Sequence, residues 1–205
     1  FIYWGKKTRK VQNWLIPTVI DKVWNQERAY DIYSRLLEDR IIFLGDAIDS
    51  DVANTVIAQI LFLEKQDPKA PITIYVNSPG WHVTAWLAIY DVMQYVQCDI
   101  ITVCIWLAAS MWSIILAWWT KWKRYSLPNS EIMIHQPLWW AEWQATDIKI
   151  AAEHILRTWN RLYSILAHHT WKDVKEIEKD CDRDNFMSPE EALKYWLIDK
   201  IIKNK

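Results

Sequence analysis

Glycine is scarce in this chain. The 205 residues include only three glycines, whereas average usage would give about 14 in this length. Tryptophan is abundant instead, with 16 copies. Several tryptophans stand where a chain normally turns, such as Trp81 directly after Gly80 and Trp122 between two lysines. Glycine tolerates a positive φ and close backbone approach, which an indole side chain does not. These scattered turn positions do not form an aromatic binding surface.

Cysteine and net charge are also low. The three cysteines, Cys98, Cys104 and Cys181, are odd in number and lack the spacing of metal ligands. They predict reduced thiols in a cytosol-like compartment. The net charge is −1 and no long basic run occurs, so we expect no nucleic-acid partner. Motifs of the P-loop, G-x-G-x-x-G and H-E-x-x-H kinds are absent, and therefore we expect no metal and no cofactor.

One uncharged run is long enough to be considered as a membrane span. It covers 21 mostly apolar residues between Asp99 and Lys121, about the length of a transmembrane helix. Its first part, IITVCI, is β-branched, whereas AASMWSIILA is rich in small residues and helix formers. Neither half is long enough alone, so we predict a buried strand followed by a buried helix and no membrane association. The first five residues are too short for a secretory signal.

The remaining pattern is that of one α/β domain with a substantial core. Hydrophobic residues make up 52% of the chain and charged residues 24%, which indicates a globular protein. Alternating strands and helices favour a layered domain with a largely parallel sheet. Strands are predicted at 40–44, 72–76, 100–105, 124–127, 131–135 and 197–202. Helices are predicted at 28–37, 50–66, 84–96, 145–168 and 172–180, with a further helix capped at residue 188.

Three separated motifs carry the candidate chemistry. Ser110, in AASM, is predicted to sit on a tight turn between a strand and a helix. There its hydroxyl lies near free N–H groups and the positive end of the helix dipole. His135 ends the predicted strand of MIHQP, and Asp184 lies in DRDNF. Serine, imidazole and carboxylate are the groups that acyl transfer requires.

Each of these residues also has an ordinary interpretation. A serine at a helix start is usually a cap, and a strand histidine is usually a hydrogen-bonded core residue. Asp184 lies in a charged run that is typical of a solvated surface. The G-x-S-x-G elbow of lipases is absent. The residue types and their spacing therefore leave these alternatives open.

Longer matching segments are more specific. Over about residues 15–202 the chain resembles the proteolytic subunit of the ATP-dependent Clp protease, a family of caseinolytic serine peptidases. The two motifs around Ser110 and His135 are the most specific. The segments that match are LIPTVI, ERAYDIYSRLLEDRIIFLG, NSPG, AIYD, AASM, KRYSLPNS, MIHQPL, QATDI, LAHHT, FMSPEEA and LIDKII.

The resemblance implies a role for each candidate residue. It makes Ser110 the nucleophile, His135 the general base and Asp184 the group that orients the base. The backbone N–H groups of Trp81 and Met111 would form the oxyanion hole. The implied activity is endopeptidase cleavage of unfolded polypeptides into short peptides, without metal or cofactor.

The resemblance also implies a fold and an assembly. The fold would be a Clp protease/crotonase-like α/β spiral of strand-strand-helix units, in a single domain over 1–205. An N-terminal tail or axial loop would cover 1–25, and a protruding helical handle about 136–170. Two stacked heptameric rings would join through the handle, and an AAA+ unfoldase would supply ATP hydrolysis, in the cytoplasm or an organelle of bacterial origin. The implied unfoldase-docking residues are Tyr75, Tyr95, Val103, Ile105, Tyr125, Leu127 and Ile202.

The departures from the family pattern are mostly tryptophans at its usual glycines. An overpacked or strained site costs about 1–3 kcal/mol, and the eleven sites together would exceed the ~5–15 kcal/mol that stabilises a typical domain. The usual glutamine two residues after Ile105 is Leu107. The sites are Trp81, Trp86, Trp106, Trp112, Trp119, Trp122, Trp139, Trp140, Trp143, Trp171 and Trp196.

These departures keep two alternative functions open. The first is a catalytically impaired ring subunit, although such relatives usually lose one of the three catalytic residues. The second is a crotonase-type acyl-CoA enzyme, which shares the spiral architecture but would need no serine in AASM. Reaction with a fluorophosphonate probe separates the hydrolase from both.

Overall fold

A computed structural model describes most of the chain. The described residues are 16–23, 26–45, 47–80, 83–110, 113, 116, 122–136 and 145–203. They fall into two compact units, Phe1–Asp39 and Arg40–Lys205. The single domain over 1–205 stays a prediction, and most of the predicted tail at 1–25 lies outside the described residues.

The first unit is a hairpin followed by a short helix. Strands β1 (Thr18–Val23) and β2 (Gln26–Asp31) pair antiparallel, and α1 spans Ile32–Glu38. The Asp31 carboxylate accepts hydrogen bonds from two N–H groups of the first turn, at 3.0 and 2.9 Å, so the helix begins there. The helix predicted over 28–37 is therefore wrong for residues 28–31, because pairing with β1 holds them in a strand.

The second unit is built on a mostly parallel sheet. Its main path is β3 (Ile41–Leu44), β4 (Ile72–Ser78), β5 (Ile100–Ala109), β6 (Arg124–Ser126) and β9 (Lys200–Ile201), all parallel. Strand β7 (Glu131–Ile134) pairs parallel with β5, and β8 (Asn185–Met187) pairs antiparallel with β7. The first half of β5 contacts β6 and its second half contacts β7. The predicted α/β class with a largely parallel sheet is confirmed.

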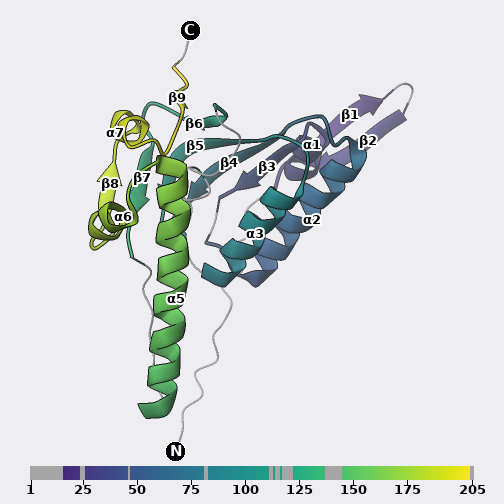
Figure 1. Cartoon of the computed structure of the whole chain (residues 1–205). Helices are drawn as coiled ribbons and strands as arrows, with labels where there is room; N and C mark the ends of the chain where they lie inside the picture. The colour runs from purple at the N-terminus through teal and green to yellow at the C-terminus, as the bar shows by residue number, and fades with distance from the viewer. Residues whose placement is uncertain are drawn as a thin grey trace, which may run out of the picture. The chain divides into compact units, whose positions relative to one another are not determined.

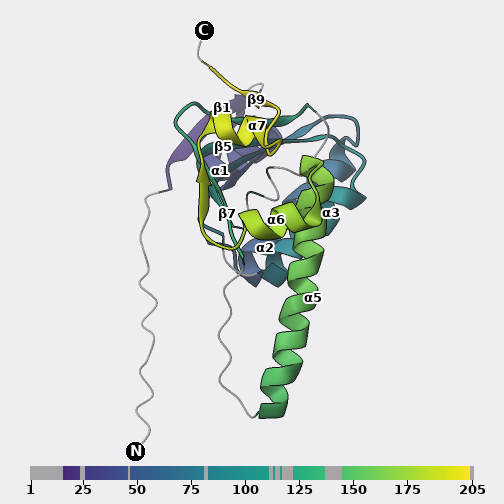
Figure 2. The same cartoon turned by 60° about the vertical axis from the view of Figure 1, so that its left-hand side comes forward.

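Two helices pack beside β3, β4 and β5 (Figures 1 and 2). They are α2 (Ser50–Gln66) and α3 (Val83–Tyr95), and their inner faces include the fully buried Ile60 and Met93. In β4 every second side chain is buried, among them Ile74. Full burial of such a side chain contributes about 1.5–3 kcal/mol, so this layer supplies much of the core.

The longest helix, α5 (Ala145–Thr170), is only partly packed. In its C-terminal half, Leu162 and Leu166 are buried. In its N-terminal half, Ile148, Ile150 and Leu156 are 45–59% exposed. Figures 1 and 2 show this half extending away from the sheet of the same unit. The N-terminal half of α5 therefore protrudes, whereas its C-terminal half is packed. The other part of the predicted handle, residues 137–144, lies outside the described residues.

Local capping signals start α2, α6 (Val174–Asp180) and α7 (Pro189–Lys194). The Asp49 carboxylate caps α2 by accepting from the N–H groups of Asp51 and Val52. Ser188 and Glu191 form the predicted capping box at α7. The starts of α2 and α7 agree with the predicted caps because a cap depends on residues only two or three positions apart. Helix α6 begins two residues after the predicted start at 172, because Asp173 caps it.

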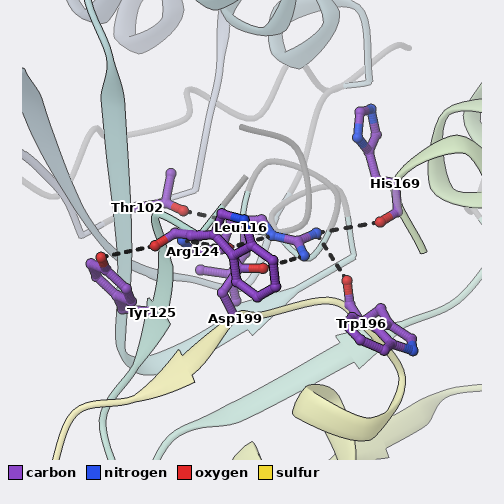
Figure 3. A network of polar contacts seen from close by, with 8 residues as sticks. Thr102, Leu116, Arg124, Tyr125, His169, Trp196 and Asp199 are labelled. Carbon is purple, nitrogen blue, oxygen red and sulfur yellow. Dashed lines mark hydrogen bonds and ion pairs between the residues drawn. The ribbon is translucent and has the colours of Figure 1, made fainter. Parts of the chain in front are cut away.

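A buried ion pair connects distant parts of the second unit (Figure 3). Arg124 Nη2 donates to Asp199 Oδ1 at 2.6 Å, and the two side chains are 8% and 6% exposed. Arg124 Nη1 also donates to the carbonyls of Trp196 at 2.9 Å and His169 at 3.4 Å. The guanidinium group therefore holds β6 against the chain after α7 and the end of α5.

The uncharged run over 100–120 begins as strand β5, as predicted. Most of the helix predicted after it lies outside the described residues. Among the helices that the structure describes, none combines the length and apolarity that crossing a bilayer requires.

Candidate active site

Three parallel strands bring their carboxyl ends to one edge of the sheet. Strand β5 pairs with β4 on one side and, near its end, with β7 on the other. Gly80, Ser110 and His135 follow β4, β5 and β7 directly or after one residue. Ligands of open α/β sheets bind outside the carboxyl ends of the strands, so this edge is where a site is expected.

The antiparallel pairing of β7 with β8 brings a fourth residue to the same edge. Ile134 pairs with Asn185 in the register of the two strands. Continuing this register by one residue sets His135 opposite Asp184. The position of the carboxylate is thus a consequence of strand pairing across 49 residues of sequence.

The three candidate side chains form one hydrogen-bonded chain. His135 Nε2 lies 2.9 Å from Ser110 Oγ, and His135 Nδ1 lies 2.9 Å from Asp184 Oδ1. The tautomer that carries its proton on Nδ1 donates to the carboxylate and accepts from the serine hydroxyl. The His135 side chain is 16% exposed, whereas that of Asp184 is 61% exposed. All three residues predicted from the sequence are therefore in contact.

Ser110 sits on a strained turn. Its φ is 59°, a conformation that is uncommon for residues other than glycine. Its N–H donates to the Met133 carbonyl at 2.8 Å, and its carbonyl accepts from Ser113 Oγ at 2.5 Å. These bonds on both sides of the residue hold its hydroxyl towards His135.

Gly80 also belongs to the site, although it was not among the predicted site residues. Its φ is 94°, and a Cβ there would lie 2.9 Å from Ser110 Cβ and 3.0 Å from the Ala109 carbonyl oxygen. Any residue with a Cβ at position 80 would therefore displace Ser110, and only glycine lets the two segments lie this close together. The SPG turn after an apolar strand was the signal that could have identified it. The predicted oxyanion donors, Trp81 and Met111, lie outside the described residues.

The described residues offer no competing centre. No cluster of His, Cys, Asp and Glu in the described part of the chain could hold a metal ion. Burial raises the pKa of each of Cys98, Cys104 and Cys181 to about 12. These thiols therefore stay protonated at neutral pH and are poor nucleophiles.

The residues predicted to dock an unfoldase lie partly in one row. Tyr75, Val103 and Tyr125 are register partners on β4, β5 and β6, and Phe43 on β3 extends the row by stacking on Tyr75 at 5.7 Å. Val103 is buried. The exposed fraction is 80% for Tyr95, at the end of α3, and 37% for Ile202, after β9. Ile105 and Leu127 are half-buried.

Comparison with protein families identifies the chain. The model of the family described as Clp protease matches residues 24–205. This span contains the whole parallel sheet and all three residues of the hydrogen-bonded chain. Membership implies a serine peptidase, assembly into rings and, in general, Clp chaperone partners. The match covers most of the sequence, and the chain therefore belongs to the Clp protease family.

Proposed function

We propose that this protein is the serine endopeptidase subunit of a compartmentalised, ATP-dependent protease that cleaves unfolded polypeptides into short peptides. The observation that carries the proposal is the chain of two 2.9 Å contacts from Ser110 through His135 to Asp184. Nucleophile, base and orienting carboxylate at such distances are the arrangement that serine hydrolysis requires.

The proposed reaction begins when His135 Nε2 takes the proton of Ser110 Oγ as this oxygen bonds to a peptide carbonyl carbon. The imidazolium then returns the proton to the departing amine, the C–N bond breaks, and an acyl-enzyme remains. Water attacks the ester with His135 again as base, and the serine is restored with release of the acid. The Asp184 carboxylate stabilises the imidazolium in both steps.

The oxyanion needs hydrogen-bond donors other than Ser110. The N–H group of this serine already donates to the Met133 carbonyl. We propose the backbone N–H groups of Trp81 and Met111 as donors, because in the sequence these residues directly follow Gly80 and Ser110, which lie at one edge of the sheet. A non-proline residue of any kind supplies such a group.

The proposed assembly is two stacked heptameric rings that work with an AAA+ unfoldase. Exposed apolar residues on α5, such as Ile150, favour a contact between rings through the handle. The unfoldase would dock on the six of the predicted residues that are exposed or half-buried, while the buried Val103 would support them from below. Because the chain has no nucleotide-binding motif, the partner would consume the ATP. The cytoplasm or an organelle of bacterial origin is the proposed location.

Labelling with a fluorophosphonate probe tests the proposal. We expect the wild-type protein to be labelled and Ser110→Ala to be unlabelled, with labelling of His135→Ala reduced at least about a thousandfold. Ser164→Ala, which removes an exposed serine on α5, is the matched control and should be labelled at the wild-type rate. A folded wild-type protein that forms rings without reacting would refute the proposal and favour the impaired ring subunit.

A further inference from the structure

The carboxylate of Asp184 has little support of its own. Its side chain is 61% exposed. In the described part of the chain, the hydrogen-bond donor to this carboxylate is His135 alone. An exposed side chain of this kind is mobile unless the backbone that carries it is held. The turn before Asp184, residues 181–183, therefore has to fix its position.

Gln136 holds this turn from the side of β7. Its main-chain N–H donates to the Cys181 carbonyl at 2.7 Å. Its side-chain Nε2 donates to the Asp182 carbonyl at 3.0 Å. Gln136 directly follows His135, so the two bonds connect the segment that carries the imidazole to the turn that carries the carboxylate.

The other side of the turn is anchored independently. Cys181 is buried at the end of α6, and its N–H donates to the Ile177 carbonyl. Asn185 Nδ2 donates to the Asp180 carbonyl at 3.2 Å. The turn thus has fixed ends. At its middle, the Asp182 N–H donates to the Lys179 carbonyl at 3.3 Å, and the side chain of Gln136 connects the Asp182 carbonyl to the segment that follows β7.

We propose that Gln136 is a positioning residue, whose side-chain amide fixes the 181–183 turn so that Asp184 faces His135. The proposal rests on the proposed function of the three residues. Gln136 makes no side-chain hydrogen bond to Ser110 or His135 among the described contacts, so it acts through the turn. A misplacement of about 1 Å in a catalytic group can cost on the order of a hundredfold in rate.

The test is the rate of fluorophosphonate labelling in Gln136→Met, which keeps the length of the side chain and removes its donor. We expect a loss of about tenfold or more, with the thermal midpoint nearly unchanged because the main-chain bond to Cys181 remains. Gln136→Glu sets an acceptor against the Asp182 carbonyl and should lose at least as much. Gln94→Met, at an exposed position of α3, is the matched control and should keep the wild-type rate.

A double-mutant cycle separates positioning from a general structural effect. In an Asp184→Asn background, Gln136→Met should add almost no further loss, because the group that it positions is already disabled. Two losses that multiply would refute the proposal. A wild-type rate in Gln136→Met would refute it as well.

Amide hydrogen exchange gives a readout that needs no reactive serine. We expect exchange at residues 182–184 to become faster in Gln136→Met and to stay unchanged in Gln94→Met. If the wild-type protein is unlabelled but exchange responds in this way, the proposed function fails and the positioning of Asp184 by Gln136 stands. Unchanged exchange would overturn the positioning role whatever the labelling shows.

Discussion

Positive φ angles at residues other than glycine are the clearest sign of local strain in this chain. Arg40 has φ of 61°, and its guanidinium group compensates by donating to four carbonyls between residues 63 and 71. Ser110 is held by the bonds of the candidate site. The others in the described part of the chain are Trp122, Trp171 and Trp196, at 76°, 55° and 67°. All three are predicted to replace family glycines, and their backbone favours glycine.

Replacing Trp122 by glycine should therefore stabilise the protein. Relief of a left-handed conformation is worth about 1–2 kcal/mol, and the extra freedom of glycine in the unfolded chain removes about 0.5–1 kcal/mol of this gain. The side chain is 69% exposed, so little packing is lost. We expect urea unfolding to show a gain of up to ~1.5 kcal/mol.

Trp106 provides the control for this change. It is 57% exposed but lies inside strand β5, and its φ is not positive. Glycine there should lower the free energy of unfolding, because glycine weakens a strand interior. A loss of stability in Trp122→Gly similar to that in Trp106→Gly would contradict the strain argument.

At the scale of elements, the Arg124–Asp199 pair joins strand β6 to the chain between α7 and β9. Because both side chains are buried, removing one partner leaves an unpaired charge in a low-dielectric interior. We expect Asp199→Ala to lower the free energy of unfolding by about 3–5 kcal/mol. Glu27→Ala, which breaks an exposed pair with Lys22, should change it by less than about 1 kcal/mol. If chemical denaturation gave the same change in the free energy of unfolding for Asp199→Ala and Glu27→Ala, the buried pair would contribute no more to stability than the exposed one.

The end of α5 makes stability depend on pH. Burial, with smaller contributions from His168 and Arg124, lowers the pKa of His169 to about 3. The unfolded chain takes up a proton near the ordinary histidine value of about 6.5, before the folded chain does. The neutral His169 therefore makes its full contribution to the free energy of unfolding above about pH 6.5, and this contribution is lost progressively as the pH falls towards 3.

The loss of stability on acidification through His169 can be measured. Between pH 6.5 and 4.5 the wild-type free energy of unfolding should fall by on the order of 2 kcal/mol because of this group. His169→Gln should reduce the pH dependence over this range, whereas His154→Gln, at an exposed position of α5, should not. Parallel pH curves for His169→Gln and the wild type would exclude His169 as the cause.

At the scale of the whole molecule, the exposed apolar residues of α5 favour assembly. Under the proposed double ring, sedimentation should give a particle many times the 24.6 kDa of one chain. Ile150→Glu places a charge on the handle and should yield particles of half the wild-type mass, because desolvating an unpaired charge opposes the ring contact. Tyr95→Ser, which alters an exposed position at the end of α3, should keep the full mass. An unchanged mass in Ile150→Glu would contradict the handle contact.

Some strands of the structure were not predicted from the sequence pattern. Strand β8 at 185–187 has only three residues, and its extended conformation depends on pairing with β7. The hairpin of β1 and β2 likewise overrode the helical spacing at 28–31. The partner of β8 lies far along the chain, whereas the partner of β2 is the strand just before it. In both cases the backbone hydrogen bonds come from another segment, and the hydrophobic periodicity within one segment carries no information about its partner.

The sequence by itself determined the capped starts of α2 and α7, the buried strands and the identity of the candidate residues, because caps, alternating burial and short motifs are local properties. Only the tertiary structure decided that Ser110, His135 and Asp184 touch, and that Gly80 and Gln136 belong to their surroundings. Ser110 and His135 are 25 positions apart in the sequence, and His135 and Asp184 are 49 positions apart. The distances of these contacts are set by the register of β5 with β7 and of β7 with β8, which forms only when the strands pair.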